Sequence, residues 1–300
     1  MADYQEYRRR ILRKRWRRNF AVAGLLVLLI LLSAVGLLWK RLHREQSPAA
    51  VQGPPIFQQE LTGSEWNTIS YTPARRLTVQ TTSAGSTAMD FRLAALDRTT
   101  AVDRSYFANV CFLGDSLTQG MQIYSSGLPE ASFCAYRGAN PSVVVNGTTC
   151  KRSDGGTEVP MEVLTARQPP VLYILLGTNV LNRDGDYSSF LTYYRLMLDM
   201  VSQALPNTQI YVQSITPVRP EVRNSHPGLY KERLCEINNE LAAIALEKNC
   251  AFLNLWEALA DDNGDLKAEY AQPDGIHIKP EGYPAWVEYL ATHTVGQQTA

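Results

Sequence analysis

Residues 109–120 read Asn-Val-Cys-Phe-Leu-Gly-Asp-Ser-Leu-Thr-Gln-Gly and decide the fold class of this chain. Asn109–Leu113 is a short apolar run that predicts a buried strand, and Gly114 follows it directly. From Ser116 to about Tyr124 the pattern becomes helical. A buried strand that turns at a glycine into a helix is the first half of a βα unit, from which parallel sheets are built.

Four more apolar segments have the length and composition of buried strands. They are Phe133–Arg137, Val171–Leu176, Gln209–Ile215 and Cys250–Leu255. Further helical stretches are Val159–Ala166, Ser188–Leu205, Tyr230–Lys248 and Pro280–Thr292. The alternation predicts an α/β domain with a central five-stranded parallel sheet between two layers of helices. In the region 139–158 the run Val143–Asn146 also fits one arm of a hairpin.

The formal net charge of zero conceals an uneven distribution along the chain. Residues 1–44 hold 11 Lys and Arg against two acidic residues, a net charge of +9, and the rest of the chain carries −9. A hydrophobic content of 45% excludes a wholly disordered chain. A net charge of zero argues against a dedicated nucleic-acid binder, whose domain is expected to be basic.

The basic end has the pattern of a membrane anchor. Phe20–Trp39 reads FAVAGLLVLLILLSAVGLLW and contains no charge. Twenty helical residues span the hydrocarbon core of roughly 30 Å. Eight basic residues precede this segment and three follow it, which predicts that residues 1–19 are cytoplasmic and that residues 20–39 form a single transmembrane helix. A cleaved signal peptide is the alternative, although its apolar region is usually only about 7–15 residues long.

The anchor is followed by a predicted linker and then by the folded domain. Residues 40–100 contain loop-type clusters such as Gly53-Pro54-Pro55 and lack a sustained period, so they are predicted to be an extracytoplasmic linker. Residues 101–297 are predicted to form the α/β domain. The anchor and the signal peptide both export this domain, and we expect a single-pass protein of the cell membrane.

Polar or small residues follow four of the predicted strands. Ser116 follows the first strand, Gly138 the second and Asn179 the third, and Asp274 and His277 come after the fifth. Each has an ordinary explanation on its own, as a helix cap, a turn residue or a surface loop residue. Because the carboxyl ends of parallel strands lie at one edge of a sheet, we expect all of them to meet there.

The spacing of Asp274 and His277 is suited to nucleophilic catalysis. An Asp three residues before a His can accept a hydrogen bond from Nδ1 and leave Nε2 free as a base, as a serine nucleophile requires. The other three histidines, His43, His226 and His293, have no Asp at that spacing.

These blocks, in this order, resemble the SGNH/GDSL hydrolase family over roughly residues 101–297. The resemblance rests on Gly114-Asp115-Ser116-Leu117, a lone glycine, Gly177-Thr178-Asn179 and Asp274-Gly275-Ile276-His277. It implies the SGNH hydrolase fold, a flavodoxin-like three-layer sandwich. One departure is Val180, where the family often has an Asp.

The resemblance also implies the role of each residue at the site. Ser116 would be the nucleophile, His277 the general base and Asp274 the residue that orients it. The oxyanion hole would consist of the Ser116 N–H, the Gly138 N–H and the Asn179 side chain. Gly147 competes with Gly138 for the second position.

No other motif in the chain indicates a metal or a cofactor. There is no His/Cys spacing of a zinc site and no phosphate loop, so we expect neither a metal nor a cofactor. Asp261–Asp265 resembles part of a calcium loop but lacks its Glu, and is predicted to be a polar turn. Of the five cysteines, Cys134 and Cys150 are a candidate disulfide, and the odd count leaves at least one free thiol unless chains pair.

Together these features predict a membrane-anchored, extracytoplasmic serine esterase without a cofactor or a nucleic-acid partner. From its location we expect O-acyl esters as substrates, first of all O-acetyl groups on cell-envelope carbohydrate. Three alternatives remain open. They are an O-acyltransferase, a lipid or lysophospholipid esterase, and a catalytically silent binding module.

Overall fold

The computed structural model describes residues 90–124 and 127–296. The predicted cytoplasmic segment at 1–19, the predicted transmembrane helix at 20–39 and the first part of the predicted linker lie outside the described residues. Within the described part, no helix combines the length and the apolar character needed to cross a membrane.

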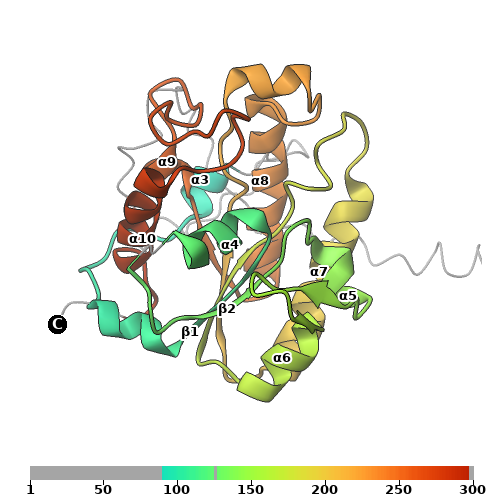
Figure 1. The fold of residues 1–300 in the computed structure, drawn as a ribbon, viewed down its shortest axis with the longest axis vertical. Helices are drawn as coiled ribbons and strands as arrows, with labels where there is room; N and C mark the ends of the chain where they lie inside the picture. The colour runs from blue at the N-terminus through green and yellow to red at the C-terminus, as the bar shows by residue number, and fades with distance from the viewer. Residues whose placement is uncertain (1–89, 125–126, 297–300) are drawn as a thin grey trace, which may run out of the picture. The chain divides into compact units, whose positions relative to one another are not determined.

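A five-stranded parallel sheet forms the centre of the domain (Figure 1). Its strands are β1 (Val110–Gly114), β2 (Ser132–Ala135), β5 (Val171–Leu175), β6 (Gln209–Gln213) and β7 (Ala251–Leu253). Their order across the sheet is β2-β1-β5-β6-β7, and each neighbouring pair is parallel. The predicted five-stranded parallel sheet is therefore confirmed, with each strand within a few residues of its predicted position.

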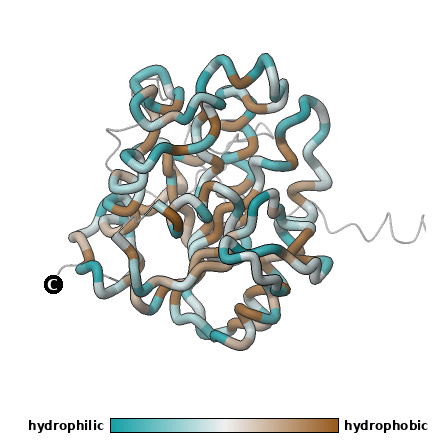
Figure 2. Tube along the Cα trace, in the orientation of Figure 1, coloured by the Kyte–Doolittle hydropathy of each residue, from teal (hydrophilic) through white to brown (hydrophobic). Residues whose placement is uncertain are grey.

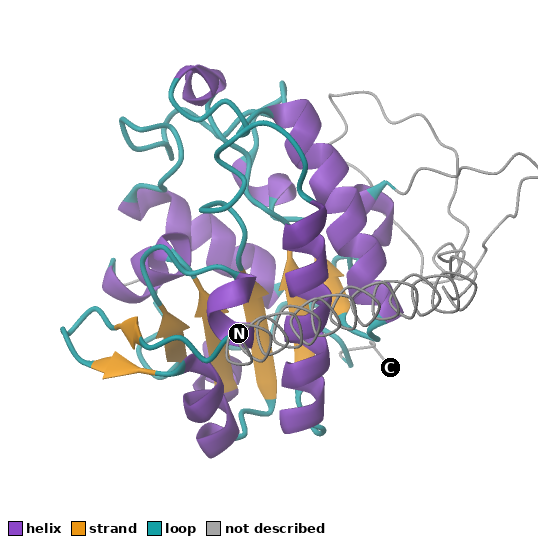
Figure 3. Ribbon diagram, turned by 90° about the vertical axis from the view of Figure 1, so that its right-hand side faces the viewer, coloured by secondary structure: helices purple, strands orange, loops and turns teal. Residues whose placement is uncertain are grey.

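Helices cover both faces of this sheet (Figure 3). One face carries α3 (Phe91–Ala94), α5 (Pro141–Val145), α6 (Pro160–Arg167), α7 (Ser188–Ala204) and α8 (Lys231–Glu247). The other carries η2 (Arg104–Asn109), α4 (Ser116–Ile123) and α10 (Tyr283–Ala291). The short elements η3 (Pro220–Asn224), α9 (Trp256–Leu259) and η4 (Pro280–Gly282) lie in the connections that follow β6 and β7.

Two separate hydrophobic cores result from this arrangement. Successive residues of a strand point to opposite faces, so β1 sends Cys111 and Leu113 into one core and Val110 and Phe112 into the other. Both faces of the strand are buried, as a parallel sheet between helices requires. The strands accordingly run through hydrophobic segments, while the outer loops are mostly hydrophilic (Figure 2).

A row of aromatic rings crosses four strands on one face of the sheet. Phe112 of β1 stacks on Phe133 of β2 at 5.1 Å between ring centroids and on Tyr173 of β5 at 5.3 Å. Tyr173 in turn stacks on Tyr211 of β6 at 4.5 Å. These rings are direct cross-strand neighbours in the register of the sheet. Such pairs add to the stability that simple burial supplies.

The strands that follow β1 in the sequence lie on opposite sides of it, and this reversal marks the place of the site. The chain passes from β1 to β2 at the edge of the sheet and then crosses to β5 on the other side of β1. In open α/β sheets, ligands bind outside the carboxyl ends of the strands at such a reversal. The reversal lies between β1 and β5, which places the segments after these strands at the expected site.

The hairpin-arm interpretation of Val143–Asn146 is wrong. The segment belongs to α5, where Asn140 Oδ1 accepts a hydrogen bond from the Ser142 N–H at 3.0 Å and Pro141 occupies the first turn. Capping and packing against α7 override the strand preference of three successive valines. The hairpin of this region lies further on, in β3 (Cys150–Lys151) and β4 (Thr157–Glu158).

The folded domain begins before residue 101, so the end of the predicted linker belongs to the domain. The Phe91 N–H donates to Asn239 Oδ1 of α8 at 2.8 Å, and the Leu96 N–H donates to the Phe252 carbonyl of β7 at 2.9 Å. The Phe91 ring packs edge-on against Phe252 and Trp256. A single turn of helix with one buried aromatic ring leaves too short a pattern to detect in a sequence.

The five cysteines are all free thiols. Cys134 lies on β2 with its Sγ 3.8 Å from Sγ of Cys111 on β1. Cys150 Sγ instead donates to the Thr148 carbonyl at 3.6 Å. The candidate disulfide between Cys134 and Cys150 is therefore not formed in this structure.

We expect Phe112→Ala to lower the free energy of unfolding by about 3–5 kcal/mol, because it removes a fully buried ring from the centre of the aromatic row. Phe112→Leu retains most of the side-chain volume and should lose clearly less. Urea denaturation of the two variants and the unsubstituted protein measures both effects. A loss below about 1 kcal/mol for the alanine variant would contradict the importance given to this row.

Candidate active site

Ser116 is the first residue of α4 and lies directly beyond the carboxyl end of β1. Gly114 makes the tight turn possible, because a Cβ there would overlap the Thr118 side chain and the Leu175 carbonyl. Asp115 caps the helix, with Oδ1 accepting from the Leu117 N–H at 3.0 Å. The serine hydroxyl is thereby held at the edge of the sheet, at the positive end of a helix.

Ser116, His277 and Asp274 form a continuous chain of hydrogen bonds. Ser116 Oγ lies 2.9 Å from His277 Nε2, and His277 Nδ1 lies 2.6 Å from Asp274 Oδ2. The first bond joins residues 161 positions apart in the sequence. A carboxylate on Nδ1 orients the imidazole and leaves Nε2 to receive a proton from the hydroxyl. The structure thus brings together the three residues that the sequence analysis selected.

A tight turn fixes the Asp274 carboxylate against its histidine. Asp274 Oδ1 accepts from the N–H groups of Ile276 and His277, both at 2.9 Å, while Oδ2 faces the ring. Gly275 has a φ of 73°, in the left-handed region, and a Cβ there would meet Val222 and Arg219. The geometry of the Asp274–His277 pair is therefore determined within the four residues Asp-Gly-Ile-His.

The Asp274 carboxyl is ionised at neutral and mildly acidic pH. Burial raises the pKa of this carboxyl, but the hydrogen bonds from the backbone N–H groups of His277 and Ile276 and from the His277 ring outweigh burial. Together they hold the pKa of Asp274 below its usual range. A charged carboxylate is what the neighbouring ring needs when it becomes positive.

Two backbone N–H groups beside the serine are available for a ligand. The Ser116 N–H, in the first turn of α4, and the Gly138 N–H have no hydrogen-bond partner within the described residues. Gly138 is exposed, has a φ of 80° and has open space where a Cβ would be. The bond from the Tyr136 N–H to the Gly114 carbonyl, at 3.0 Å, keeps the ends of β2 and β1 together.

The competing residue, Gly147, serves a different purpose. It follows the end of α5 with a φ of 60°, and its N–H donates to the Val144 carbonyl at 3.3 Å. This is the arrangement of a glycine that ends a helix. The donor is used within the turn, which favours Gly138 as the residue with an available N–H.

Asn179 joins the segments that follow three different strands. Its Nδ2 donates to Asp115 Oδ2 at 3.2 Å and to the Ala139 carbonyl at 3.1 Å. Asn179 itself follows β5, whereas Asp115 follows β1 and Ala139 follows β2. The amide lies beside the residues that precede Ser116 and follow Gly138, and both of its N–H bonds point to protein acceptors.

Asp115 is a site residue to which the sequence analysis gave no role. It is 1% exposed, and burial raises the pKa of its carboxyl to about 7, although hydrogen bonds from backbone N–H groups and a charged His277 both lower it. Its position at the start of a helix, next to the serine, was the available signal. That position indicates that Asp115 caps the helix, but it does not indicate that the carboxylate is buried.

The remaining predicted features lie away from this chain of hydrogen bonds. His226 bonds to Ser225, and His293 is buried against Tyr289. Asp261 Oδ1 accepts from the N–H groups of Asn263 and Asp265, as in a polar turn. Among residues 90–124 and 127–296, no group of three His, Cys, Asp or Glu side chains could hold a metal ion.

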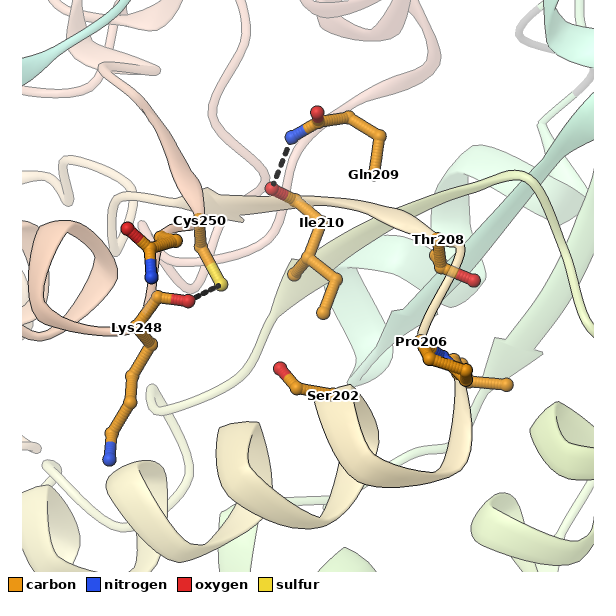
Figure 4. Close-up of a pocket in the computed structure, with 9 residues that line it drawn as sticks. Ser202, Pro206, Thr208, Gln209, Ile210, Lys248 and Cys250 are labelled. Carbon is orange, nitrogen blue, oxygen red and sulfur yellow. Dashed lines mark hydrogen bonds between the residues drawn. The ribbon is translucent and has the colours of Figure 1, made fainter.

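A pocket of about 130 Å³ lies at the opposite edge of the sheet (Figure 4). It is lined by the end of α7 and by residues just before β6 and β7, including Thr208 and Cys250. Its cation, Lys248, pairs with Asp199 at 2.7 Å. The amino ends of parallel strands lie at the edge opposite Ser116, so this pocket is separate from the candidate active site.

Solved structures similar to this chain include three hydrolases. A GDSL-like lipase from Bacteroides thetaiotaomicron VPI-5482 has a TM-score of 0.45 at 15% identity, covering 60% of this chain and 84% of that one. The lipase/acylhydrolase from Enterococcus faecalis has a TM-score of 0.43 at 13% identity, covering 61% and 92%. A carbohydrate esterase family 3 structure from Talaromyces cellulolyticus has a TM-score of 0.42 at 16% identity, covering 61% and 93%. Comparison with curated proteins gave no match.

A family model also matches the chain. The model of the GDSL-like lipase/acylhydrolase family matches residues 112–285, which is more than half of the sequence. The matched range begins in β1, ends in α10 and includes Ser116, Asn179 and His277. The chain therefore belongs to the GDSL-like lipase/acylhydrolase family and is an ester hydrolase.

Proposed function

We propose that this protein is a membrane-anchored, extracytoplasmic serine esterase that removes O-acyl groups, chiefly O-acetyl groups, from cell-envelope carbohydrate. One observation carries the catalytic part of this proposal. Ser116 Oγ, His277 and Asp274 form a chain of hydrogen bonds of 2.9 and 2.6 Å at the carboxyl edge of the sheet.

The first half of the reaction uses all three side chains. Ser116 Oγ attacks the ester carbonyl carbon while His277 Nε2 takes the hydroxyl proton. Asp274, ionised and bonded to Nδ1, stabilises the positive ring. The tetrahedral intermediate then collapses, His277 returns the proton to the leaving alcohol, and the acyl group remains on Ser116 as an ester.

Stabilisation of the oxyanion and hydrolysis of the acyl-enzyme complete the cycle. The free N–H groups of Ser116 and Gly138 are suited to donate to the negative oxygen. Asn179 donates to Asp115 and to the Ala139 carbonyl, so it would contribute by exchanging the Ala139 bond for one to the oxyanion. Removing one such donor typically costs about 10²–10³ in rate. Water activated by His277 attacks the acyl carbonyl and releases the carboxylic acid and free Ser116.

The exposure of the site supports a substrate that carries a short acyl group on a large alcohol. The side chains of His277 and Asp274 are 41% and 47% exposed. A polymer can approach such a surface directly, whereas a long acyl chain requires a deep apolar pocket to remove it from water.

The charge distribution of the chain supports the location and, through it, the substrate class. The +9 segment with an uncharged run at 20–39 favours a cytoplasmic N-terminus, and the −9 remainder would face the envelope. A tether of about fifty residues, from 40 to 89, can reach glycans outside the membrane. The net charge of −9 on residues 45–300 is unfavourable for binding anionic lipid surfaces.

We expect Ser116→Ala to abolish hydrolysis of p-nitrophenyl acetate without lowering the thermal unfolding temperature, because only the attacking oxygen is removed. Ser225→Ala is a matched control. Ser225 Oγ lies 2.9 Å from His226 Nδ1, but no Asp or Glu of the described part pairs with that histidine. A fluorophosphonate should label Ser116 and leave Ser225 unlabelled. Full activity in the Ser116 variant, or an unlabelled Ser116 in folded protein, would overturn the catalytic assignment.

We expect turnover to fall steeply as the acyl chain lengthens, because the exposed site offers a long chain little apolar surface. The test compares p-nitrophenyl acetate, butyrate and palmitate with acetylated oligosaccharides and a lysophospholipid. Analysis of the products detects acyl transfer to sugar hydroxyls. Faster cleavage of palmitate or of the lysophospholipid would contradict the proposed substrate class, and transfer exceeding hydrolysis would identify an O-acyltransferase.

We expect the full-length chain to remain in the membrane fraction after alkaline carbonate extraction. The double variant Leu28→Arg, Leu31→Arg should be released, because each central arginine costs a membrane helix about 2.5–3.5 kcal/mol. Intact-mass measurement of the isolated protein tests cleavage. Release of the unsubstituted chain, or loss of its first residues as in a processed signal peptide, would contradict the anchor.

A further inference from the structure

Asp115 has a structural position that helix capping alone does not require. Its Oδ1 accepts from the Leu117 N–H at 3.0 Å and its Oδ2 accepts from Asn179 Nδ2 at 3.2 Å. The chain caps other helices with similar side chains in less buried places, such as Asp103, which is exposed and accepts from the Ser105 N–H at 2.9 Å. Removing a carboxylate from water is unfavourable, and a cap gains nothing from it.

The groups that face Asp115 show what this burial achieves. Besides the Leu117 N–H and the Asn179 amide, a charged His277 stabilises the carboxylate, and the carboxylate in turn contributes to raising the pKa of Tyr283 on α10. The Asp115 side chain therefore joins the start of the helix that carries the serine to the amide that follows β5.

The carboxylate determines which way the Asn179 amide points. An amide turned over would place its Oδ1 against two acceptors, Asp115 Oδ2 and the Ala139 carbonyl. The observed orientation instead places Nδ2 between them, next to the residues that precede Ser116 and follow Gly138. Both N–H groups of the amide are thus directed at protein acceptors.

On this geometry, and resting on the proposed function, we propose that Asp115 is a positioning residue for catalysis that acts through Asn179. Its buried carboxylate fixes the orientation of the Asn179 amide, so that the other N–H, which donates to the Ala139 carbonyl here, is the one that an oxyanion would take over. It does so in addition to capping α4. Asp115 does not contact the reacting atoms in this scheme.

Two substitutions separate the two roles of Asp115. Asn and Ser cap helices about as well as Asp, so Asp115→Asn and Asp115→Ser preserve the bond to Leu117. With its oxygen on the Leu117 N–H, Asn places an NH2 donor where Asp has Oδ2, so it cannot accept from Asn179 there. Ser is too short to reach both groups. We expect kcat for p-nitrophenyl acetate to fall at least about tenfold in both variants, within the usual range for a lost oxyanion donor, with KM little changed.

A double-mutant cycle tests whether the effect passes through Asn179. If it does, the double variant Asp115→Asn, Asn179→Ala should be no slower than Asn179→Ala alone, to within about twofold. Asp103→Asn is the matched control, since it changes a capping Asp away from the site and should leave kcat unchanged. If the fold-losses in kcat of the two single variants multiply in the double variant, the inference is overturned.

The unfolding temperature of the Asp115→Asn variant at different pH values separates the two roles. If Asp115 had a purely structural role, the substitution would lower this temperature. Burial raises the pKa of Asp115 to about 7 in the folded state, above its value of about 3.9 in an unfolded chain. The ionised carboxylate therefore opposes folding, and stability is lost as pH rises through 7. At about pH 8 the Asp115→Asn variant should unfold at the same or a higher temperature while its kcat is lower.

The outcomes distinguish this inference from the proposed function. If Ser116→Ala is inactive but both Asp115 variants keep their kcat within about twofold, the inference fails alone. The inference is also overturned if the kcat of each Asp115 variant falls in proportion to its loss of stability. In that case a lower unfolding temperature alone explains the slower turnover. If Ser116→Ala retains full turnover, the proposed function fails and the inference fails with it.

Discussion

The parallel pairing of β1 with both β2 and β5 is the constraint on which the rest of the structure depends. Gly114 stands opposite Ala135 on one side and Leu175 on the other, so the three strands end at the same level. The chain leaves them through Ser116, Gly138 and Asn179. A hydroxyl, a free backbone N–H and an amide therefore meet at one edge of the sheet, because the register of the strands brings them there.

The stability of this platform and the requirements of the site oppose each other at one residue. The aromatic row across β2, β1, β5 and β6 and the two cores that flank the sheet stabilise the strands. At the end of β1 the same chain buries the Asp115 carboxylate, and burial raises the pKa of that group to about 7. A rigid sheet can retain such an unfavourable group, which is common where a protein positions reacting groups.

The five apolar runs predicted the sheet well, because a strand buried on both faces leaves a continuous hydrophobic segment. The region 139–158 was harder to predict. Three successive valines became α5 through an Asn140 cap and contacts with α7, while the hairpin formed from polar residues such as Lys151 and Thr157. The contacts of α5 with α7 join segments distant in sequence, which a local pattern does not report, and a hairpin of two-residue strands is too short to leave a pattern. The same reason explains why Phe91 was assigned to the linker.

The sequence by itself determined which groups follow each strand and the local pairing of Asp274 with His277, since that pair lies within one tight turn. It also determined membership of the family, through blocks that are each a few residues long. Only the tertiary structure decided that His277 reaches Ser116 and that Asn179 donates to a buried Asp115. Those contacts join residues 161 and 64 positions apart, and their distances are set by how the strands and helices pack.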